Sequence, residues 1–366
     1  MDRDAAIRSV QDGSAWEEFC AALRSAGRVV LDAAPDDPLD RAEGLRYVGR
    51  LATHALRSFL EESDPAHPRL STSTPKIGGD NPDYVYAQCA VSGGLEYRLR
   101  GERGDAHRIG FGTYHGGLGT PEGLQASGYL TDAELEVDAD GRFEIVLSAR
   151  PRPGNWLAMR ADTNQLMIRQ TLLDRRRGRP ARFEIERQGR ASPPAPLDPA
   201  AYAAALARAQ GFVAGVTRQF VGWSRAFAAR PNQIFPLPAE LARAARGDAG
   251  TLYYNGYFEL AEDEALVVDL EPPRCDYWNL QVCNHWLESL DFMEYTTHVN
   301  HHTARARPDG SVRILIARRD PGLPNWIDTA GHARGAIALR WVNAERDSPP
   351  RTHVARLADL ATAPGG

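Results

Sequence analysis

The sequence predicts a mainly β protein of the α+β class, in which a helical segment joins two related β modules and a helical N-terminal region precedes them. Two observations predict this organisation. Helical periodicity alternates along the chain with short β-like runs, and one stretch of the first β region recurs in the second. With 366 residues, the chain is long enough for more than one hydrophobic core.

Apolar residues at spacings of three and four indicate the two helical regions. The N-terminal region spans residues 1–66, where Pro65 and Pro68 end the second apolar stripe. The helical linker spans residues 197–247 and is rich in alanine. The stripes consist of Trp16, Phe19 and Leu23, of Leu45, Val48, Leu51, Ala55 and Phe59, and, in the linker, of Phe212, Val216, Phe220, Trp223 and Phe227.

The β modules are predicted at 84–188 and 251–345, with 346–366 as a tail. Both contain short β-like runs separated by glycine turns, such as LEYRLRG and RFEIVLSAR in the first module. The stretch DGRFEIVLSARPRPGNWL (140–157) recurs as DGSVRILIARRDPGLPNWI (309–327), and IRQ (168–170) recurs as LRW (339–341). These matches predict two copies of one module.

A hairpin closed by a left-handed glycine is predicted in each copy, at Gly141 and at Gly310. The expected register pairs apolar residues with each other, as one buried face requires. In copy one the pairs are Val137–Phe143, Leu135–Ile145 and Ala133–Leu147, and in copy two they are Ala306–Val312, Ala304–Ile314, His302–Ile316, Asn300–Arg318 and His298–Asp320.

The stretch HVNHH (298–302) stands out in this register, because it directs His298, Asn300 and His302 inward and His301 outward. Copy one has Tyr129, Thr131 and Ala133 at the three inward positions. Buried polar groups need partners, so the polar end of copy two suggests the wall of a wet pocket. The alternative is a sheet end that emerges into solvent.

Charge and composition exclude several classes of partner. The formal net charge is -5, so no basic field would attract nucleic acid or anionic lipid. No run approaches the ~20 apolar residues of a membrane span, and the first residues lack a signal-peptide core. The four cysteines form no CxxC motif, so we expect a cytoplasmic protein with reduced thiols.

Four blocks resemble one protein family: GGDNPDYVYAQCAVSGGLEYRLRGERG (78–104), PGNWL (153–157), YWNLQVCNHW (277–286) and DGSVRILIARRDPGLPNWIDTAGHARGAIALRW (309–341). They are similar to the bacterial domain of unknown function 1214 family, over about residues 16–360. The resemblance implies jelly-roll-like β-sandwiches with accompanying helices, often in homo-oligomers, and no established reaction. The sequence departs from the family pattern at His298 and His302, where a small hydroxyl residue and an amide-type residue are expected. The family's recurring positions fall here on Asn284, Trp286, Asp291, Asn300, Asp320, Asn325, Trp326, Asp328, Thr329, Gly331, Arg340 and Trp341.

Acid–base chemistry by histidine and carboxylate side chains is the catalytic hypothesis. The candidate catalytic residues are His298, His302, Asp320 and Asp328. Candidate substrate-binding residues are Asn300, Arg318, Trp286, Trp278, Asn284, His285 and Trp326. Two alternatives stay open: Asp328 with Thr329 and Gly331 resembles a turn network, and Asn325–Trp326 recurs as Asn155–Trp156, which is typical of a fold element.

Other chemistries have less support. His298 and His302 are four strand residues apart, about 13 Å at ~3.3 Å per residue, so they cannot share a tetrahedral ion. His298 with Asn300, Asp320 or His285 could still hold a metal, but we expect none. Cys283 and His285 would lie too far apart along a strand for a nucleophile and its base. Phosphate-loop and dinucleotide motifs are absent from the sequence.

Two functions therefore remain. The first is a small-molecule enzyme with acid–base, hydrolytic or lyase chemistry and no organic cofactor, acting on an aromatic or polycyclic substrate in the second β module. The second is a non-catalytic ligand-binding protein or oligomeric scaffold.

Overall fold

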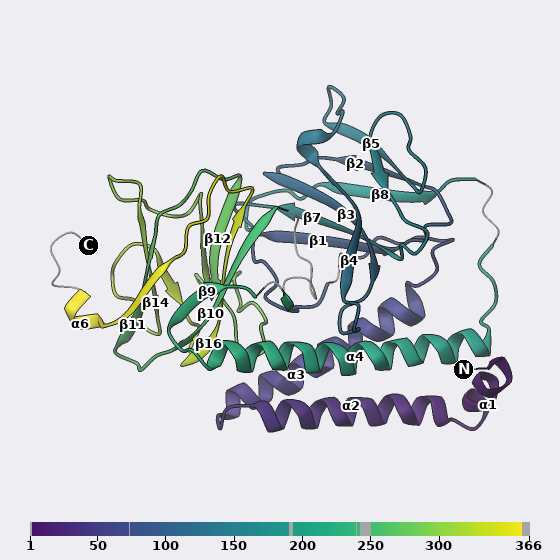
Figure 1. Ribbon diagram of the computed structural model, residues 1–366, viewed down its shortest axis with the longest axis horizontal. Coiled ribbons are helices and arrows are strands. Elements are labelled where there is room, and N and C mark those ends of the chain that lie inside the picture. Colours follow the sequence, from purple (N-terminus) through teal and green to yellow (C-terminus); the bar gives the residue numbers. More distant parts are fainter. Residues whose placement is uncertain (1, 73, 190–192, 239, 242–249, 361–366) are drawn as a thin grey trace.

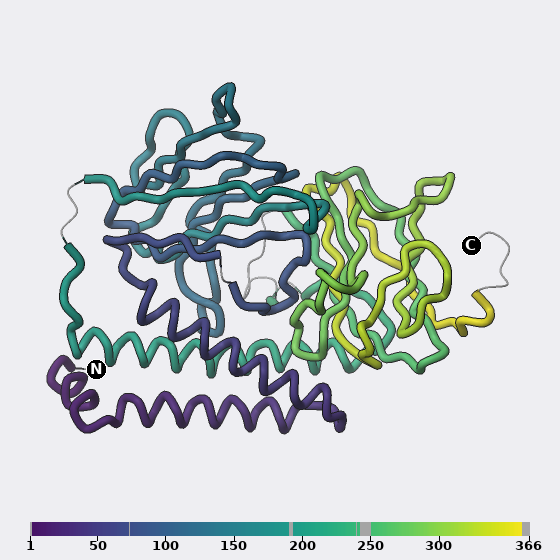
Figure 2. Tube along the Cα trace, turned by 180° about the vertical axis from the view of Figure 1, so that it is seen from behind, coloured from purple at the N-terminus to yellow at the C-terminus, as the bar shows by residue number. Residues whose placement is uncertain are grey.

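The computed structural model describes residues 2–72, 74–189, 193–238, 240–241 and 250–360. Two β-sandwiches lie side by side, and long helices run beneath them (Figure 1). Seen from behind, α2 (Ser14–Ala33) and α4 (Pro199–Ala228) run alongside each other (Figure 2). The predicted α+β class with two related β modules is confirmed.

The helices begin where the sequence supplies capping residues. The side chains of Asp2, Asp37 and Asp198 each accept a hydrogen bond from a backbone N–H two residues further on. Proline occupies the first turn of α3 and of α4, where its missing N–H costs nothing. Besides α2 and α4, the helices are α1 (Arg3–Gln11), α3 (Pro38–Leu56), the π-helical turn η1 (Arg57–Glu61), the short η2 (Asp132–Glu134) and α6 (Leu357–Leu360).

The first sandwich packs two four-stranded sheets face to face. Sheet A has the order β1 (Tyr84–Ala90), β7 (Gln165–Thr171), β3 (Arg108–Gly116) and β4 (Leu124–Thr131). Sheet B has the order β6 (Trp156–Ala158), β5 (Arg142–Ser148), β2 (Tyr97–Glu102) and β8 (Arg182–Arg187).

The second sandwich repeats this strand order. Sheet C has the order β13 (His298–Asn300), β12 (Tyr277–Val282), β16 (Arg334–Val342), β10 (Thr251–Glu259) and β9 (Gln233–Pro236). Sheet D has the order β15 (Trp326–Asp328), β14 (Val312–Ala317), β11 (Glu264–Leu270) and β17 (Arg351–Arg356). Sheet C corresponds to sheet A with β9 added, and sheet D corresponds to sheet B.

The repeated Asn-Trp pair has the same structural role in both sandwiches. The Asn155 amide donates to the carbonyls of residues 136 and 144, and Asn325 donates to those of residues 305 and 313. The indoles of Trp156 and Trp326 donate to strand carbonyls at 3.2 and 3.0 Å. The interpretation of this pair as a fold element is thus supported by its contacts.

The predicted hairpin register is wrong in both copies. The left-handed glycines do form, at Gly141 (φ 78°) and Gly310 (φ 82°). However, β5 pairs with β2 and β14 pairs with β11, whereas β4 and β13 belong to the other sheet of each sandwich. The pairings of His298 with Asp320 and of Asn300 with Arg318 therefore do not exist. A strand can bury its apolar face whichever strand it pairs with. The alternation of apolar and polar residues therefore does not by itself select the next strand in the sequence as the pairing partner.

Two further boundaries differ from those expected. Helix α4 ends at Ala228, because Pro231 cannot continue it, and the linker goes on to form β9. Residues 239 and 242–247 of the predicted linker lie outside the described residues. The predicted tail contributes β17, which pairs with β11 as β8 pairs with β2, while residues 361–366 lie outside the described residues.

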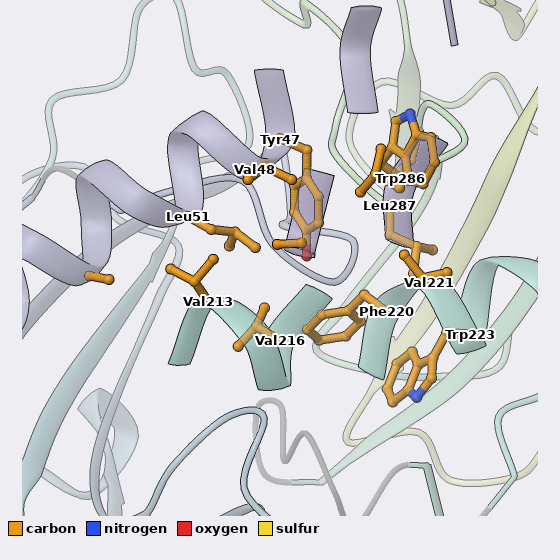
Figure 3. Packing of buried hydrophobic residues seen from close by; sticks show 14 of the residues in the cluster. Tyr47, Val48, Leu51, Val213, Val216, Phe220, Val221, Trp223, Trp286 and Leu287 are labelled. Atoms are coloured by element: carbon orange, nitrogen blue, oxygen red, sulfur yellow. The ribbon is translucent and has the colours of Figure 1, made fainter. Parts of the chain in front are cut away.

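One apolar cluster joins the helices to both sandwiches. Figure 3 shows α3 and α4 packed against each other and against Trp286 and Leu287 of the second sandwich. On the other side, Gly119 in the β3–β4 loop approaches the backbone of α4 so closely that a Cβ on Gly215 would lie 2.1 Å from its carbonyl oxygen. Helix α4 therefore fixes how far apart the two sandwiches stand.

Helix α3 fits onto the second sandwich at Gly44. A Cβ there would lie 2.6 Å from the ring of Trp286, which is 1 % exposed, and 2.4 Å from Val30. The Trp286 indole donates to the carbonyl of Asp40 at 2.7 Å, so the ring cannot move aside without losing that bond.

We predict opposite effects for two glycine substitutions in α3. Gly44→Ala forces the Trp286 ring to shift and lowers the free energy of unfolding by about 1–3 kcal/mol. Gly49→Ala meets no atom within 4 Å and raises it by about 0.5–1 kcal/mol through helix propensity. Urea denaturation measures both, and an equal gain from the two substitutions would contradict this packing.

Candidate functional site

A cavity of about 970 Å³ lies between the two sandwiches, and α3, η1 and α4 also line it. Sheets A and C contribute the faces that point away from their own cores. The two faces touch at Tyr84 and Tyr277, whose ring centroids are 5.9 Å apart.

The two sheets present equivalent residues to this cavity. In sheet A, Tyr86 on β1 lies opposite Arg169 on β7, and in sheet C, Tyr253 on β10 lies opposite Arg340 on β16. All four line the cavity, as do Gln88 and Asn255 two residues further along β1 and β10. The internal repeat therefore supplies a Tyr–Arg pair and an amide from each sandwich.

Arg169 is 7 % exposed and, within the part of the chain that the structure describes, is held by one hydrogen bond. Its Nη1 donates to the hydroxyl oxygen of Tyr114 at 2.6 Å, and its Cζ lies 5.6 Å from the centre of that ring. One of the five guanidinium N–H donors is thus used. The ring of Tyr114 takes the space above Gly112, where a Cβ would lie 2.4 Å from the hydroxyl oxygen.

Arg340 is 6 % exposed and is held more firmly. Its Nη1 donates to Gln281 Oε1 at 2.6 Å and to Asn279 Oδ1 at 3.3 Å, and its Nη2 donates to the carbonyl of Gly79. Its Nε–H and the second Nη2 proton are left over. In the described ranges, no carboxylate comes within ion-pair distance of either arginine.

The charged side chains of the lining are predominantly positive. They comprise four arginines (69, 169, 208 and 340) and two acids (62 and 80), a difference of +2 in a chain with net charge -5. Both acids have partners of their own, since Glu62 accepts from Arg57 at 2.6 Å and Asp80 accepts from the Ser289 backbone at 2.9 Å. Burial also raises the pKa of Asp80 above its usual value, although Ser289, Lys76 and Arg340 oppose the rise.

Aromatic side chains complete the lining. Phe59, Phe212, Phe220 and Trp223 come from η1 and α4, and they face the tyrosines of the two sheets. His54 of α3 also lines the cavity, and burial lowers its pKa to about 4, so it is neutral at pH 7. The cavity therefore combines an apolar surface with cationic groups, which suits an aromatic or otherwise apolar anion.

The HVNHH stretch joins the two sandwiches and does not line this cavity. The Nε2 of His298 lies 2.9 Å from Asp83 Oδ1, and the Asn300 amide donates to the Leu173 carbonyl at 3.2 Å. The ring of His301 lies 5.2 Å from that of His107, and His302 is exposed. The strand β13 that was expected to wall a pocket is thus an edge of sheet C docked on the first sandwich.

The other candidate catalytic residues and two of the candidate binding residues lie around the β14–β15 connection. Asp320 is exposed and accepts from the Gly322 N–H at 2.8 Å, and Asp328 accepts from the Ala330 N–H at 2.7 Å. Both carboxylates hold turns, which supports the turn-network alternative for Asp328. Arg318 is half-buried beside them, and the Trp326 indole is bonded within its own sheet.

The four remaining candidates are buried structural groups. Trp278 packs against Trp341 in the second core, and Trp286 packs on α3. Asn284 bonds the backbone of residues 286 and 288 and so ties the turn between them. The hydroxyl of Tyr257 lies 2.6 Å from Nδ1 of His285. The structure does not bring the predicted site residues together, and none of them lines the cavity.

The internal repeat contains a sequence signal that points to the two arginines of the cavity. The matched segments IRQ and LRW place Arg169 and Arg340 at equivalent positions, each directly after apolar residues of a largely buried strand. A charged residue repeated at one position of two buried strands indicates a shared polar surface.

Two further findings concern metals and membranes. In the ranges that the structure describes, no three His, Cys, Asp or Glu side chains gather in a way that could hold a metal ion. No helix of these ranges has the length and apolar character needed to cross a bilayer.

We predict a pH effect from His285. Burial, with Arg334 and Arg225 nearby, lowers its pKa to about 4, while an unfolded histidine titrates near 6.5. The neutral ring therefore contributes stability above pH 6.5, and that stability is lost as the pH falls towards 4. The loss amounts to at most about 3 kcal/mol, since one pKa unit is worth about 1.4 kcal/mol.

Denaturation of wild type and His285→Gln between pH 4 and 7 measures this contribution. The wild type loses more stability on acidification than the variant does, and His302→Gln, at an exposed position, serves as the control. Parallel pH curves for wild type and His285→Gln would contradict the assignment.

The chain is similar to known proteins of no established function. The family model described as "Protein of unknown function (DUF1214)" matches residues 118–171 and 260–346. An uncharacterised protein from Burkholderia cenocepacia, whose crystal structure is known, is 43% identical, with a TM-score of 0.93, over 97% of this chain and 100% of that one.

The VPA0106 protein from Vibrio parahaemolyticus is 11% identical, with a TM-score of 0.48, over 84% of this chain and 96% of that one. That likeness is too slight to transfer any property. None of the curated proteins matches the chain. The family match, together with the close similarity to the Burkholderia protein along nearly the whole length, shows that the chain belongs to the DUF1214 family.

Proposed function

We propose that the chain binds a small anionic molecule with an aromatic or similarly apolar body in the cavity between its two sandwiches. The observation that carries this proposal is the pair of buried guanidinium groups, Arg169 and Arg340, on the cavity wall. Neither is paired with a carboxylate in the described ranges, and both have N–H donors left over.

The energetics of burial support a ligand. Removing an unpaired charge from water costs several kcal/mol, and proteins ordinarily pair such groups. Among the described residues, Arg169 has a single tyrosine hydroxyl as hydrogen-bond partner, which does not neutralise it. A bound carboxylate or phosphate would accept charge-assisted, often bidentate, hydrogen bonds from the guanidinium.

The surroundings of the cavity favour anions over cations. Arg69 and Arg208 also line it and are exposed, so they lie on the solvent side of the two buried arginines. Positive groups at the entrance of a cavity raise the local concentration of anions. This local field contrasts with the chain's net charge of -5.

Asp80 is the observation that favours catalysis, and thus a small-molecule enzyme, over binding alone. Its carboxyl group lies on the cavity wall, accepts hydrogen bonds from the Ser289 backbone N–H and hydroxyl, and has a raised pKa. A buried carboxyl group whose pKa is raised holds its proton to a higher pH than a free carboxyl group does, and in its protonated form it can act as a general acid towards a bound substrate. The acid–base hypothesis for this chain is therefore proposed at Asp80.

Ligand-induced thermal shift tests the anion site. We predict that 2-naphthoate raises the melting temperature of the wild type, whereas 2-naphthamide does not, because only the acid neutralises the arginines. Arg169→Met reduces the shift, because one of the two arginines is lost, while its own stability stays equal or rises, since a poorly paired buried charge is removed. Arg177→Met, at an exposed position, keeps the shift. A full shift in Arg169→Met would contradict the proposal.

Calorimetry in buffers of different ionisation enthalpy tests Asp80. An anion bound near Asp80 raises the pKa of its carboxyl further, so in a series of pH values 2-naphthoate binding takes up protons where that carboxyl titrates. Asp80→Asn binds the acid but removes the uptake. Binding without proton uptake in the wild type would argue against a titrating acid at this position.

A further inference from the structure

We infer that the ligand carries two separate acidic groups, one for each arginine, at the two ends of an apolar body: an aromatic dicarboxylate. This inference rests on the proposed anion site and specifies the class of molecule that fills it.

The two guanidinium groups form two half-sites. Arg169 belongs to the first sandwich and is anchored by Tyr114 on β3, while Arg340 belongs to the second and is anchored by Gln281 and Asn279 on β12. Each arginine has its own cross-strand tyrosine, Tyr86 or Tyr253. Because each sandwich contributes the same set, each offers one acid-binding position.

The anchors prevent the two arginines from converging freely on one anion. Three acceptors from the described ranges hold the guanidinium of Arg340, and with respect to these ranges its Nε–H and one Nη2 proton remain for a ligand. The bond from Arg169 to Tyr114 directs that guanidinium towards β3, on its own sheet. Two acceptor groups at separate positions satisfy these donors with less rearrangement than a single group.

Both half-sites lie within reach of one small molecule. Tyr86 lies opposite Arg169 across β1 and β7, and the Nη2 of Arg340 donates to the carbonyl of Gly79, two residues before Asn81. The Tyr86 hydroxyl oxygen also accepts the Asn81 N–H at 3.0 Å, which fixes the ring between the two half-sites.

The balance of charge in the cavity also favours a diacid. A monoacid neutralises one guanidinium and leaves the other buried without a counter-charge, which is costly. A diacid neutralises both. The tyrosines of sheets A and C and the phenylalanines of η1 and α4 then contact the apolar body between the two acids.

The experiment compares matched acids by calorimetry. The pairs are benzoate with terephthalate, 2-naphthoate with naphthalene-2,6-dicarboxylate, and biphenyl-4-carboxylate with biphenyl-4,4′-dicarboxylate, so the body is constant within a pair and the acid spacing varies between pairs. In the wild type, at least one diacid binds about tenfold or more tightly than its monoacid. In Arg169→Met that ratio falls to near one, while monoacid binding at Arg340 persists.

Further variants and ligands distinguish a failure of the diacid inference from a failure of the anion site. Arg169→Lys keeps the charge and retains part of the diacid preference, and circular dichroism checks that each variant is folded. Monoacids that bind while no diacid binds more tightly would overturn this inference and leave the anion site standing. Phenyl phosphate that binds more tightly than every diacid, and is lost in Arg169→Met, would overturn it in favour of a single-anion site. Failure of every acid to bind the folded wild type would overturn the anion site itself.

Discussion

The packing of α4 is the constraint on which the rest of the structure depends. On one side the helix shares an apolar cluster with α3 and with Trp286 and Leu287 of the second sandwich, and on the other it touches Gly119 of the first sandwich, backbone to backbone. Neither sandwich can approach the other without breaking these contacts. The two facing sheets therefore enclose a cavity of about 970 Å³ that the chain does not fill, and the residues on its walls are available to a ligand.

Duplication explains the composition of those walls. A sandwich needs one apolar face for each sheet, so the outer faces of sheets A and C could become polar without loss of either core. Both copies carry a Tyr–Arg pair on that face, and their different anchors, Tyr114 in one copy and Gln281 in the other, show how the copies diverged around a common arrangement. His298 of β13 lies at the contact between the sandwiches, 2.9 Å from Asp83.

The sequence was sufficient to predict the fold class and the internal repeat, because both follow from local patterns. Helical stripes, glycine turns and the Asn-Trp pair each depend on neighbours in the chain, and they appear where expected, except that Trp16 and Leu45 of the predicted stripes are exposed. Strand pairing is non-local: β14 pairs with β11 across more than forty residues, and alternation fits that partner as well as the expected hairpin. The site was missed for the same reason, since Arg169 and Arg340 come together only through the docking of two sandwiches that no local pattern encodes.

The central claim is that the two buried arginines bind the two ends of one dianionic ligand. A crystal structure grown with naphthalene-2,6-dicarboxylate tests it most directly. We expect difference density for a flat molecule in the cavity, with one carboxylate at hydrogen-bond distance from Arg169 and the other from Arg340, and with its rings against Tyr86. Density for the acid elsewhere on the protein, with the two guanidinium groups bonded only to protein and solvent, would contradict it.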